Sequence, residues 1–295
     1  NLQQLPVERM ISTTRRSRGF TLIELVTVIV ILGVASAGIA SFVRGSMQTY
    51  IDVSTREQLL SESRFAIERL KRELRNALPN SVRITGNTSY HCMEFVPINW
   101  ATVYTDLPDA GDATYEIDVV ALHDINNVPY ELPGGDNFAV VYPTRSEDVF
   151  DANNGHRVTV SGCSDDGDGD CTTLDDSDNI VQLEVTGLLA QESPASRVYL
   201  IDRAVSYCVY QNRLIRYEND LLVNQLGAFP GLPVIAGHVV NVLSADPVNN
   251  PQEDDPFRII STSLQSNSIA EVRLRFIDNN EQIAYQQEIH IANIP

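Results

Sequence analysis

The sequence predicts an α+β fold, in which a long N-terminal helix packs on a mainly antiparallel β-sheet domain. Three observations lead to this prediction: a 24-residue apolar run from Phe20 to Val43, a helical apolar stripe after it, and short β-patterned runs over the remaining chain. With 295 residues, 43% of them hydrophobic, the chain can bury a sizeable core.

The apolar run carries one charge, Glu24, before the next charged residue at Arg44. As a helix, this run rises roughly 36 Å, which is enough to cross a bilayer core of about 30 Å. Arg15, Arg16 and Arg18 precede the run, so the N-terminus is expected to stay in the cytoplasm and the remaining chain to lie outside. Because a carboxylate in hydrocarbon costs about 3 kcal/mol, Glu24 is expected to have a partner.

The block Arg18–Glu24 (RGFTLIE) resembles the prepilin signal of the type IV pilins and type II secretion pseudopilins. In that family a membrane peptidase cuts after the glycine and methylates the new N-terminus. The resemblance implies that Gly19 is the last leader residue and that Phe20 becomes the N-methylated mature end. It also implies that Glu24 meets the N-terminal amine of a neighbouring subunit, an attraction that is strong in low dielectric.

The same resemblance divides the chain into a leader (1–19), a membrane half of the helix (20–43), an amphipathic half (44–79) and a periplasmic β-rich domain (80–295). Since Met10 is the first methionine, residues 1–9 are expected to precede the true start. The partners implied are a prepilin peptidase, other minor and major pilins and an inner-membrane assembly platform. The implied location is the inner membrane, and then the filament on the cell surface.

Other N-terminal signals fit part of this pattern. A secretory signal would end at Ala35-Ser36-Ala37, but the apolar run continues beyond that point and Glu24 would lie inside it. A simple signal anchor explains the helix and the arginines, but not Glu24. The pair Arg15-Arg16 also suggests a twin-arginine signal, although polar residues follow where that signal needs apolar ones.

Small residues recur every four positions in the apolar half of the helix, at Gly33, Ala37 and Ser41. Such a row lets helices approach closely in lipid, and the alternative is a helix that is merely rich in small residues.

Beyond Met47 the apolar residues continue at helical spacings, with charged residues on the other face. The apolar positions are Leu60, Ile67, Leu70, Leu74, Ala77 and Leu78. The helix is therefore expected to reach about Leu78 and to end at Pro79-Asn80.

Seven runs after the helix have strand composition: Ser81–Thr85, His91–Pro97, Glu116–Leu122, Phe138–Tyr142, Arg157–Ser161, Ile180–Thr186 and Val239–Leu243. Two hairpins are also expected. One joins Ala204–Tyr210 to Arg213–Glu218 through Gln211-Asn212, and the other joins Ala270–Ile277 to Gln282–Ile291.

Four cysteines, Cys92, Cys163, Cys171 and Cys208, lie in the part expected to be outside, where disulfides form and three connectivities exist. We pair Cys163 with Cys171 because they are close in sequence, and Cys92 with Cys208 by elimination. Thiol ligation of a metal is the alternative, but no Cys-x-x-Cys spacing occurs.

Between Cys163 and Cys171, Asp166, Asp168 and Asp170 alternate as at the start of a calcium loop. The sixth and twelfth positions of such a loop are then Cys171 and Ser177 instead of glycine and glutamate. Calcium is therefore one interpretation, and a solvated acidic turn is the other.

The chain after Gly19 has a net charge of −21, since the whole chain is −18 and residues 1–19 hold four arginines and one glutamate. This excludes an electrostatic basis for binding nucleic acid or anionic lipid head groups. The five histidines have no metal-ligand spacing, and no nucleophile or phosphate-binding motif occurs. The chain is therefore not expected to be an enzyme.

The stretch from Arg18 to about Ile84, particularly Ser54–Gln58 and Arg64–Leu70, resembles minor pilins of the mannose-sensitive haemagglutinin (MSHA) pilus. It is similar, more distantly, to PilW-type minor pilins and J-type minor pseudopilins. This resemblance implies a minor pilin that takes part in the assembly or priming of the filament, and it places the subunit at the filament tip. The alternatives are a J-type subunit of a type II secretion system and a membrane-anchored periplasmic binding or adhesin module.

Overall fold

The structure is a computed structural model of the whole chain, and it divides into two units, residues 1–54 and residues 55–295. Each unit is described by itself. The residues described are 19–121, 132–164, 179–225, 231–260, 268–279 and 281–291.

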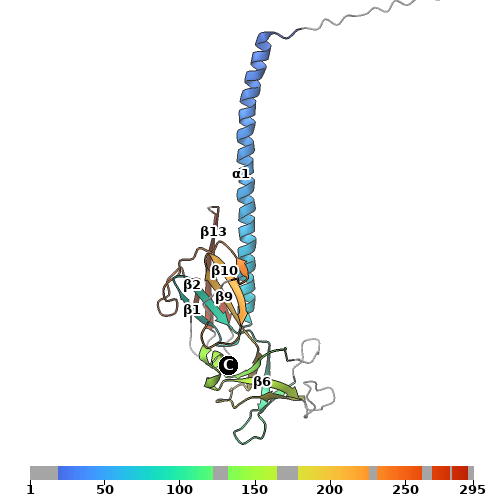
Figure 1. Cartoon of the computed structure of the whole chain (residues 1–295), viewed down its shortest axis with the longest axis vertical. Coiled ribbons are helices and arrows are strands. Elements are labelled where there is room, and N and C mark those ends of the chain that lie inside the picture. Colours follow the sequence, from blue (N-terminus) through green and yellow to red (C-terminus); the bar gives the residue numbers. More distant parts are fainter. Residues whose placement is uncertain are drawn as a thin grey trace, which may run out of the picture. The chain divides into compact units, whose positions relative to one another are not determined.

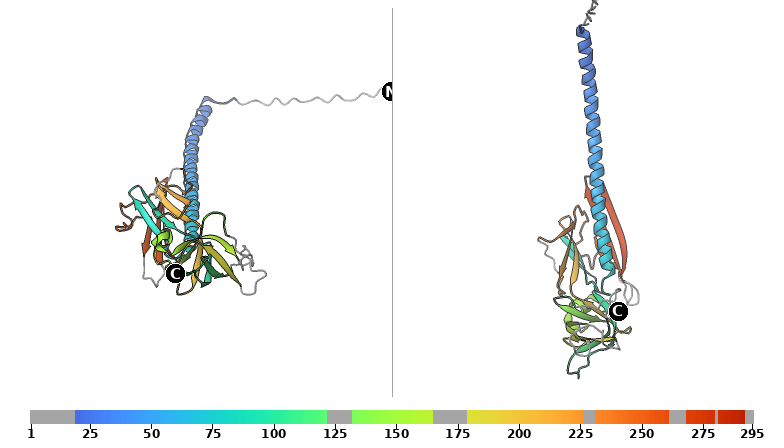
Figure 2. Two further views of the ribbon diagram at one scale, coloured as in Figure 1. Left: turned by 60° about the horizontal axis from the view of Figure 1, so that its bottom comes forward. Right: turned by 90° about the vertical axis from the view of Figure 1, so that its right-hand side faces the viewer.

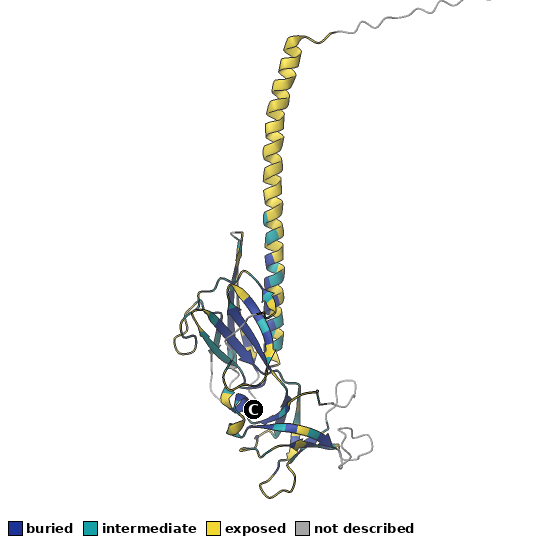
Figure 3. Cartoon of the chain, viewed as in Figure 1, coloured by how far each residue is buried: buried dark blue, intermediate teal, exposed yellow. Residues whose placement is uncertain are grey.

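Helix α1 (Figure 1) spans Leu22–Arg75, and its residues fall in both units. The buried positions all come after residue 55 and recur every three or four residues; they are Leu59, Ser63, Ala66, Ile67, Leu70 and Leu74. Figure 3 shows this change along the helix from exposed to partly buried. The second half of α1 therefore presents one apolar face to the protein core, as the sequence pattern predicts.

The helix ends three residues before the predicted end. The amides of Asn76 and Ala77 bond the carbonyls of Glu73 and Leu74 in a tightened last turn, at 3.1 Å each. The chain then leaves the helix to pair with a later segment, since Leu78 N–H donates to Val96 at 2.7 Å and Ile98 N–H donates to Asn76 at 2.9 Å. Backbone pairing with this segment therefore ends the helix before the proline.

The described strands of the second unit form two sheets and a closed barrel, and every strand pair is antiparallel. The first sheet has the order β1-β2-β9-β10-β11. Its strands are β1 (Arg83–Asn87), β2 (Tyr90–Phe95), β9 (Ala204–Tyr210), β10 (Arg213–Asn219) and β11 (Val234–Ala236). The β9–β10 hairpin is the one predicted, and its turn residues Gln211 and Asn212 have positive φ, as a two-residue hairpin turn requires.

The barrel consists of strands that lie between β2 and β9 in the sequence. In chain order they are β3 (Trp100–Asp106), β4 (Glu116–Val120), β5 (Asn137–Val141), β6 (Arg157–Ser164), β7 (Ile180–Val185) and β8 (Arg197–Ile201). Because Phe95 of β2 pairs with Val205 of β9, the chain leaves and re-enters the first sheet at neighbouring positions. The barrel is thus an insertion between two paired strands.

The second sheet has the order β12-β13-β14, from β12 (Phe257–Ile260), β13 (Ser268–Asp278) and β14 (Glu281–Ile291). Strand β14 lies beside the second half of α1, as the right-hand view of Figure 2 shows. Two contacts define this placement: Ser63 Oγ lies 3.3 Å from Tyr285 Oη, and Arg56 lies 4.0 Å from Glu281.

Two main clusters form the hydrophobic core of the second unit. One joins α1 to both sheets, with Leu70, Leu74, Tyr207 and Phe276 fully buried in it. The other fills the barrel with side chains such as Ile117 and Leu183. A smaller cluster, which includes Leu78, Val140, Phe150 and Tyr199, joins the outer face of the barrel to the helix α2 (Ser146–Phe150) and the first sheet.

Most of the predicted runs are strands, but four strands and the closure of the barrel were not predicted. The missed strands are β3, β8, β11 and β12. The run Val239–Leu243 was predicted as a strand, and this prediction is wrong. Val239 makes one isolated bridge to Phe276, and beyond it the side chain of Asn241, instead of a strand backbone, bonds the carbonyl of Arg273 and the N–H of Arg275. The β13–β14 ladder also extends to Asp278 and Glu281, so the turn is shorter than predicted.

Candidate processing and assembly site

The first turn of α1 is held by a reciprocal pair of side chains, Thr21 and Glu24. The Glu24 carboxylate oxygen Oε2 accepts hydrogen bonds from the backbone N–H and the hydroxyl of Thr21, both at 3.1 Å. In return, Glu24 N–H donates to Thr21 Oγ1 at 3.3 Å. This arrangement is a capping box, which satisfies backbone donors that have no partner inside the helix.

Glu24 therefore has a local partner in this chain. Its carboxylate lies at the helix N-terminus, where the helix dipole favours negative charge. In the part of the chain that the structure describes, no hydrogen bond is made by the second carboxylate oxygen of Glu24, so this oxygen can accept a further donor. The arrangement can thus receive one more hydrogen-bond donor, such as an amine, without losing its cap.

Gly19 and Phe20 lie immediately before the helix and are exposed, with 83% of the Phe20 surface accessible. A protease can therefore reach the bond between them without unfolding the helix. Cleavage there would leave a new N-terminus next to Thr21, within the same turn as Glu24.

The row Gly33, Ala37 and Ser41 lies on the exposed part of α1. No atom lies within 4 Å of the position that a Cβ would take at Gly33. The Ser41 hydroxyl donates to Gly38 O at 2.8 Å, so it is satisfied within the helix. The row is open to another helix, and its packing role stays a prediction.

Among the described residues, α1 is the helix that is long and apolar enough to cross a membrane. Its apolar side chains in residues 22–43 are all exposed; Leu22 and Val34, for example, are 81% and 71% accessible. Such a surface needs lipid or other helices around it, because exposed apolar patches of this size are unusual in a monomer in water.

The structure joins Cys92 to Cys208 in a disulfide, the pair expected from the sequence. The two residues are directly opposite in the β2–β9 ladder, and both are fully buried. The bond thus links the two strands between which the barrel is inserted. Cys163 lies in β6, while its predicted partner Cys171 lies outside the described residues, so that pairing stays a prediction.

Asp166, Asp168 and Asp170, the calcium candidates, also lie outside the described residues. Within the ranges that are described, no three His, Cys, Asp or Glu side chains come together as a metal-binding group. The calcium interpretation therefore stays a prediction.

A polar cluster ties the second half of α1 to the first sheet. Glu73 accepts hydrogen bonds from Arg216 Nε at 2.9 Å, from Tyr207 Oη at 3.0 Å and from Arg69 Nε at 2.9 Å. Burial alone would raise the pKa of Glu73, but the hydrogen bonds from the two arginines and the charge of Arg216 outweigh it and hold this pKa below its ordinary value. The cluster thus holds Glu73 ionised and fixes the helix on the sheet.

Sequence reasoning missed Thr21 and the Glu73 cluster for different reasons. The Thr21-x-x-Glu24 spacing is a capping-box signature that could have been recognised in the sequence. Glu73 lies 134 positions before Tyr207 and 143 positions before Arg216 in the sequence, so only the fold brings it to them.

Residues 14–40 match the family described as the prokaryotic N-terminal methylation motif. Comparison with curated proteins and with solved structures gave no significant match. The matched segment contains Gly19, Phe20 and Glu24 and most of the apolar run. The N-terminal part of the chain is therefore type IV prepilin-like, which implies processing by a prepilin peptidase and association with a membrane and with other pilins. The motif and the one apolar helix found among the described residues fit a single-pass, membrane-anchored pilin-like protein.

Proposed function

We propose that this protein is a minor pilin that takes part in the assembly or priming of a type IV pilus of the MSHA type, as an MshO-type subunit near the filament tip. It is made with a short basic leader, is cleaved after Gly19, and is methylated on Phe20. The single observation that carries this proposal is the methylation motif at residues 14–40, at the start of an apolar helix whose first turn holds Glu24.

The geometry of the first turn supports a specific role for Glu24. The capping box keeps the carboxylate at the N-terminal end of the helix, on the same turn as the proposed mature end. A neighbouring subunit's N-terminal amine then finds a carboxylate acceptor held in a fixed position. In a low dielectric each charge lowers the desolvation cost of the other, so the pairing favours insertion of one subunit beside the next.

The small-residue row supports the same proposal. Gly33 and Ala37 have no bulky side chains, so a neighbouring helix can approach this part of α1 closely. The acidic folded unit is carried outside the membrane by the positive leader, in the orientation that Arg15, Arg16 and Arg18 favour.

The experiment that tests the proposal is mass spectrometry of the N-terminal peptide from cells with and without prepilin peptidase. The expected peptide begins at methylated Phe20 and is absent in the strain without the peptidase. A start near Gly38, or an uncut chain in both strains, would contradict the proposal and favour an anchored or released binding module.

A second measurement tests Glu24. The change Glu24→Ala should leave cleavage intact and reduce incorporation into filaments at least about tenfold, because a buried amine without a counter-charge is strongly disfavoured. The matched control is Glu192→Ala, the loss of an exposed acid on the barrel, which should leave incorporation unchanged. Equal filament incorporation of both variants would refute the assembly role.

The processing motif is shared by pilins and pseudopilins, so the choice of machine needs its own test. The chain should co-purify with sheared filaments in cells that have the MSHA pilus genes and lack type II secretion. Incorporation only in cells that have type II secretion would assign it instead to the J-type pseudopilins.

A further inference from the structure

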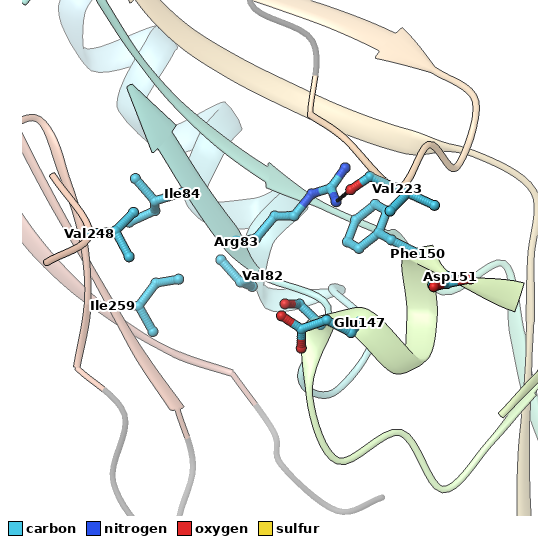
Figure 4. Close-up of a pocket in the computed structure, with 10 residues that line it drawn as sticks. Val82, Arg83, Ile84, Glu147, Phe150, Asp151, Val223, Val248 and Ile259 are labelled. Carbon is cyan, nitrogen blue, oxygen red and sulfur yellow. Dashed lines mark hydrogen bonds between the residues drawn. The ribbon is translucent and has the colours of Figure 1, made fainter. Parts of the chain in front are cut away.

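A cleft in the second unit has the features of a peptide-docking site. It has a volume of about 390 Å³ and lies between β1, β12 and α2. In Figure 4, Val82 and Ile84 on the β1 side face Val248 and Ile259, while Phe150 and Glu147 come from α2. This size is within the range of about 300–1,000 Å³ of ligand sites, and most of its lining side chains are apolar.

The cleft is bordered by two sheet edges. Strand β1 is the outer strand of the first sheet, with β2 as its described strand partner, and β12 is the outer strand of the second sheet, paired with β13. An outer strand presents backbone N–H and C=O groups on its free side, and an extended segment can pair with them. Ile84 and Ile259 therefore lie where an added strand would place its side chains.

The charges at the cleft select the occupant. The guanidinium of Arg83 is fully engaged: it pairs with the buried Glu94, donates to the carbonyls of Leu222 and Val223 at 2.7 Å each, and lies 3.5 Å above the ring of Phe150. Each of the three guanidinium nitrogens thus already has an acceptor within this chain.

The acids of the cleft differ from this arginine. Asp151 accepts two hydrogen bonds from Asn153, and its negative charge favours the charged form of Arg157. Glu147 is exposed and has no cationic partner among the residues that the structure describes. The uncompensated charge at the cleft is therefore the carboxylate of Glu147, within a unit that is acidic as a whole.

We propose that the cleft between β1, β12 and α2 binds an extended segment of a partner subunit, in which apolar residues are followed by a lysine or arginine. The apolar residues fill the space between Ile84 and Ile259, the segment's backbone pairs with the free edge of β1, and its cationic side chain meets Glu147. The proposed function supplies only the source of this segment, another filament subunit.

The test measures fluorescence anisotropy of a labelled peptide, VIVKK, added to the full-length chain in detergent micelles. Saturable binding is expected, and a VIVEE peptide should not bind, because its charge repels Glu147. A VIVKK peptide with N-methyl groups on alternate residues should also fail to bind, since it cannot pair with a strand edge. Equal binding of VIVEE, or no saturable binding of VIVKK, would overturn the proposal.

Two variants place the binding in the cleft. Glu147→Lys reverses the exposed charge and should weaken VIVKK binding about fivefold to tenfold, which corresponds to two exposed charge interactions. Glu192→Lys makes the same change on the exposed barrel surface and should bind like the wild type. If the two variants bound equally, the site would lie elsewhere.

Sedimentation of the unlabelled chain separates the other occupants. A dimer that VIVKK displaces would overturn the proposal in favour of a second copy of this chain. Since no step of this test depends on cleavage or filaments, peptide binding together with an unprocessed N-terminus would refute the proposed function and leave the docking site standing.

Discussion

The two halves of helix α1 share one continuous element but differ in every respect that concerns burial. In residues 22–54, every side chain except Asp52 is exposed, and the apolar residues lie all round the helix. In residues 55–75, apolar residues recur on one face, and that face is buried to 3% exposure or less at Leu59, Ile67, Leu70 and Leu74. No described residue covers the apolar side chains of the first half, whereas the two sheets cover the apolar face of the second half.

The carboxylates of the two halves show the same difference. Glu73 has partners on three other residues, two of them on strands of the first sheet. Among the described residues, the Glu24 carboxylate has hydrogen bonds only to Thr21. The comparison teaches that the second half of α1 is part of a folded domain, and that the first half is organised for contacts with lipid and with other chains.

The largest effect on the folded unit is expected from loss of the disulfide. Replacing both Cys92 and Cys208 by alanine opens a link between residues 116 positions apart, and should lower the free energy of unfolding by about 4 kcal/mol. Urea unfolding followed by circular dichroism measures this loss, and fluorescence of the single tryptophan, Trp100, reports on the barrel. The helicity of the exposed half of α1 should not change. A loss of helicity there would show that the exposed half depends on the folded unit.

A matched pair of leucine substitutions tests the comparison directly. Leu70→Ala removes a side chain that is 1% exposed and should lower the free energy of unfolding by about 3 kcal/mol. Leu32→Ala, at a position that is 59% exposed, should change it by less than about 0.5 kcal/mol. Similar losses for both variants in urea unfolding would show that the first half is also packed inside the monomer.

The Glu73 cluster predicts a dependence on pH. The pKa of Glu73 lies below its ordinary value of 4.5, because the arginine hydrogen bonds outweigh the effect of burial. Its contribution to stability is therefore present above pH 4.5 and is lost as the pH falls through the lowered pKa. Glu73→Gln should lower the free energy of unfolding by about 2 kcal/mol at pH 7, and by much less at the acid end.

Urea unfolding at several pH values measures this difference, with Glu24→Gln as the control. Glu24 lies in the exposed half, so its substitution should leave the free energy of unfolding of the folded unit unchanged at every pH. If wild type and Glu73→Gln differed in free energy of unfolding by the same amount from pH 7 down to acid pH, the stabilising role of the ionised Glu73 carboxylate would be contradicted.

The smallest effect is expected from the cap of the helix. Thr21→Val removes the hydroxyl of the capping box and should weaken the first turn by about 1 kcal/mol. Hydrogen exchange of the first-turn amides in micelles measures this loss. Thr27→Val is the control, because the Thr27 hydroxyl donates to the Glu24 backbone carbonyl, at 2.9 Å, and not to the capping box. Equally faster exchange in both variants would argue against the cap.

Much of the fold could be predicted because its signals are local. The apolar run, the stripe that contains Leu70 and Leu74, and the turn Gln211-Asn212 each lie within a few residues of the element that they specify. The strands that were missed depend on distant partners. Strand β8, for example, pairs with β3 and β5, and β12 is a strand because β13 lies beside it.

The candidate site divides in the same way. The spacing from Gly19 to Glu24 could be recognised in the sequence, because the motif and the capping box each lie within a few consecutive residues. The cleft at Glu147 was not, because its walls come from residues 82 to 259 and only the sheets bring them together.

By itself, the sequence determined the long helix, its division into an apolar and an amphipathic half, the prepilin-like signal and the α+β class, because periodicity and short motifs are local properties. Tertiary structure alone decided that six strands close into a barrel between β2 and β9, that Glu73 is held by Tyr207 and Arg216, and where α1 ends. The physical reason is that strand pairing and buried polar contacts join residues far apart in the chain, and their free energy depends on which partners the fold brings together.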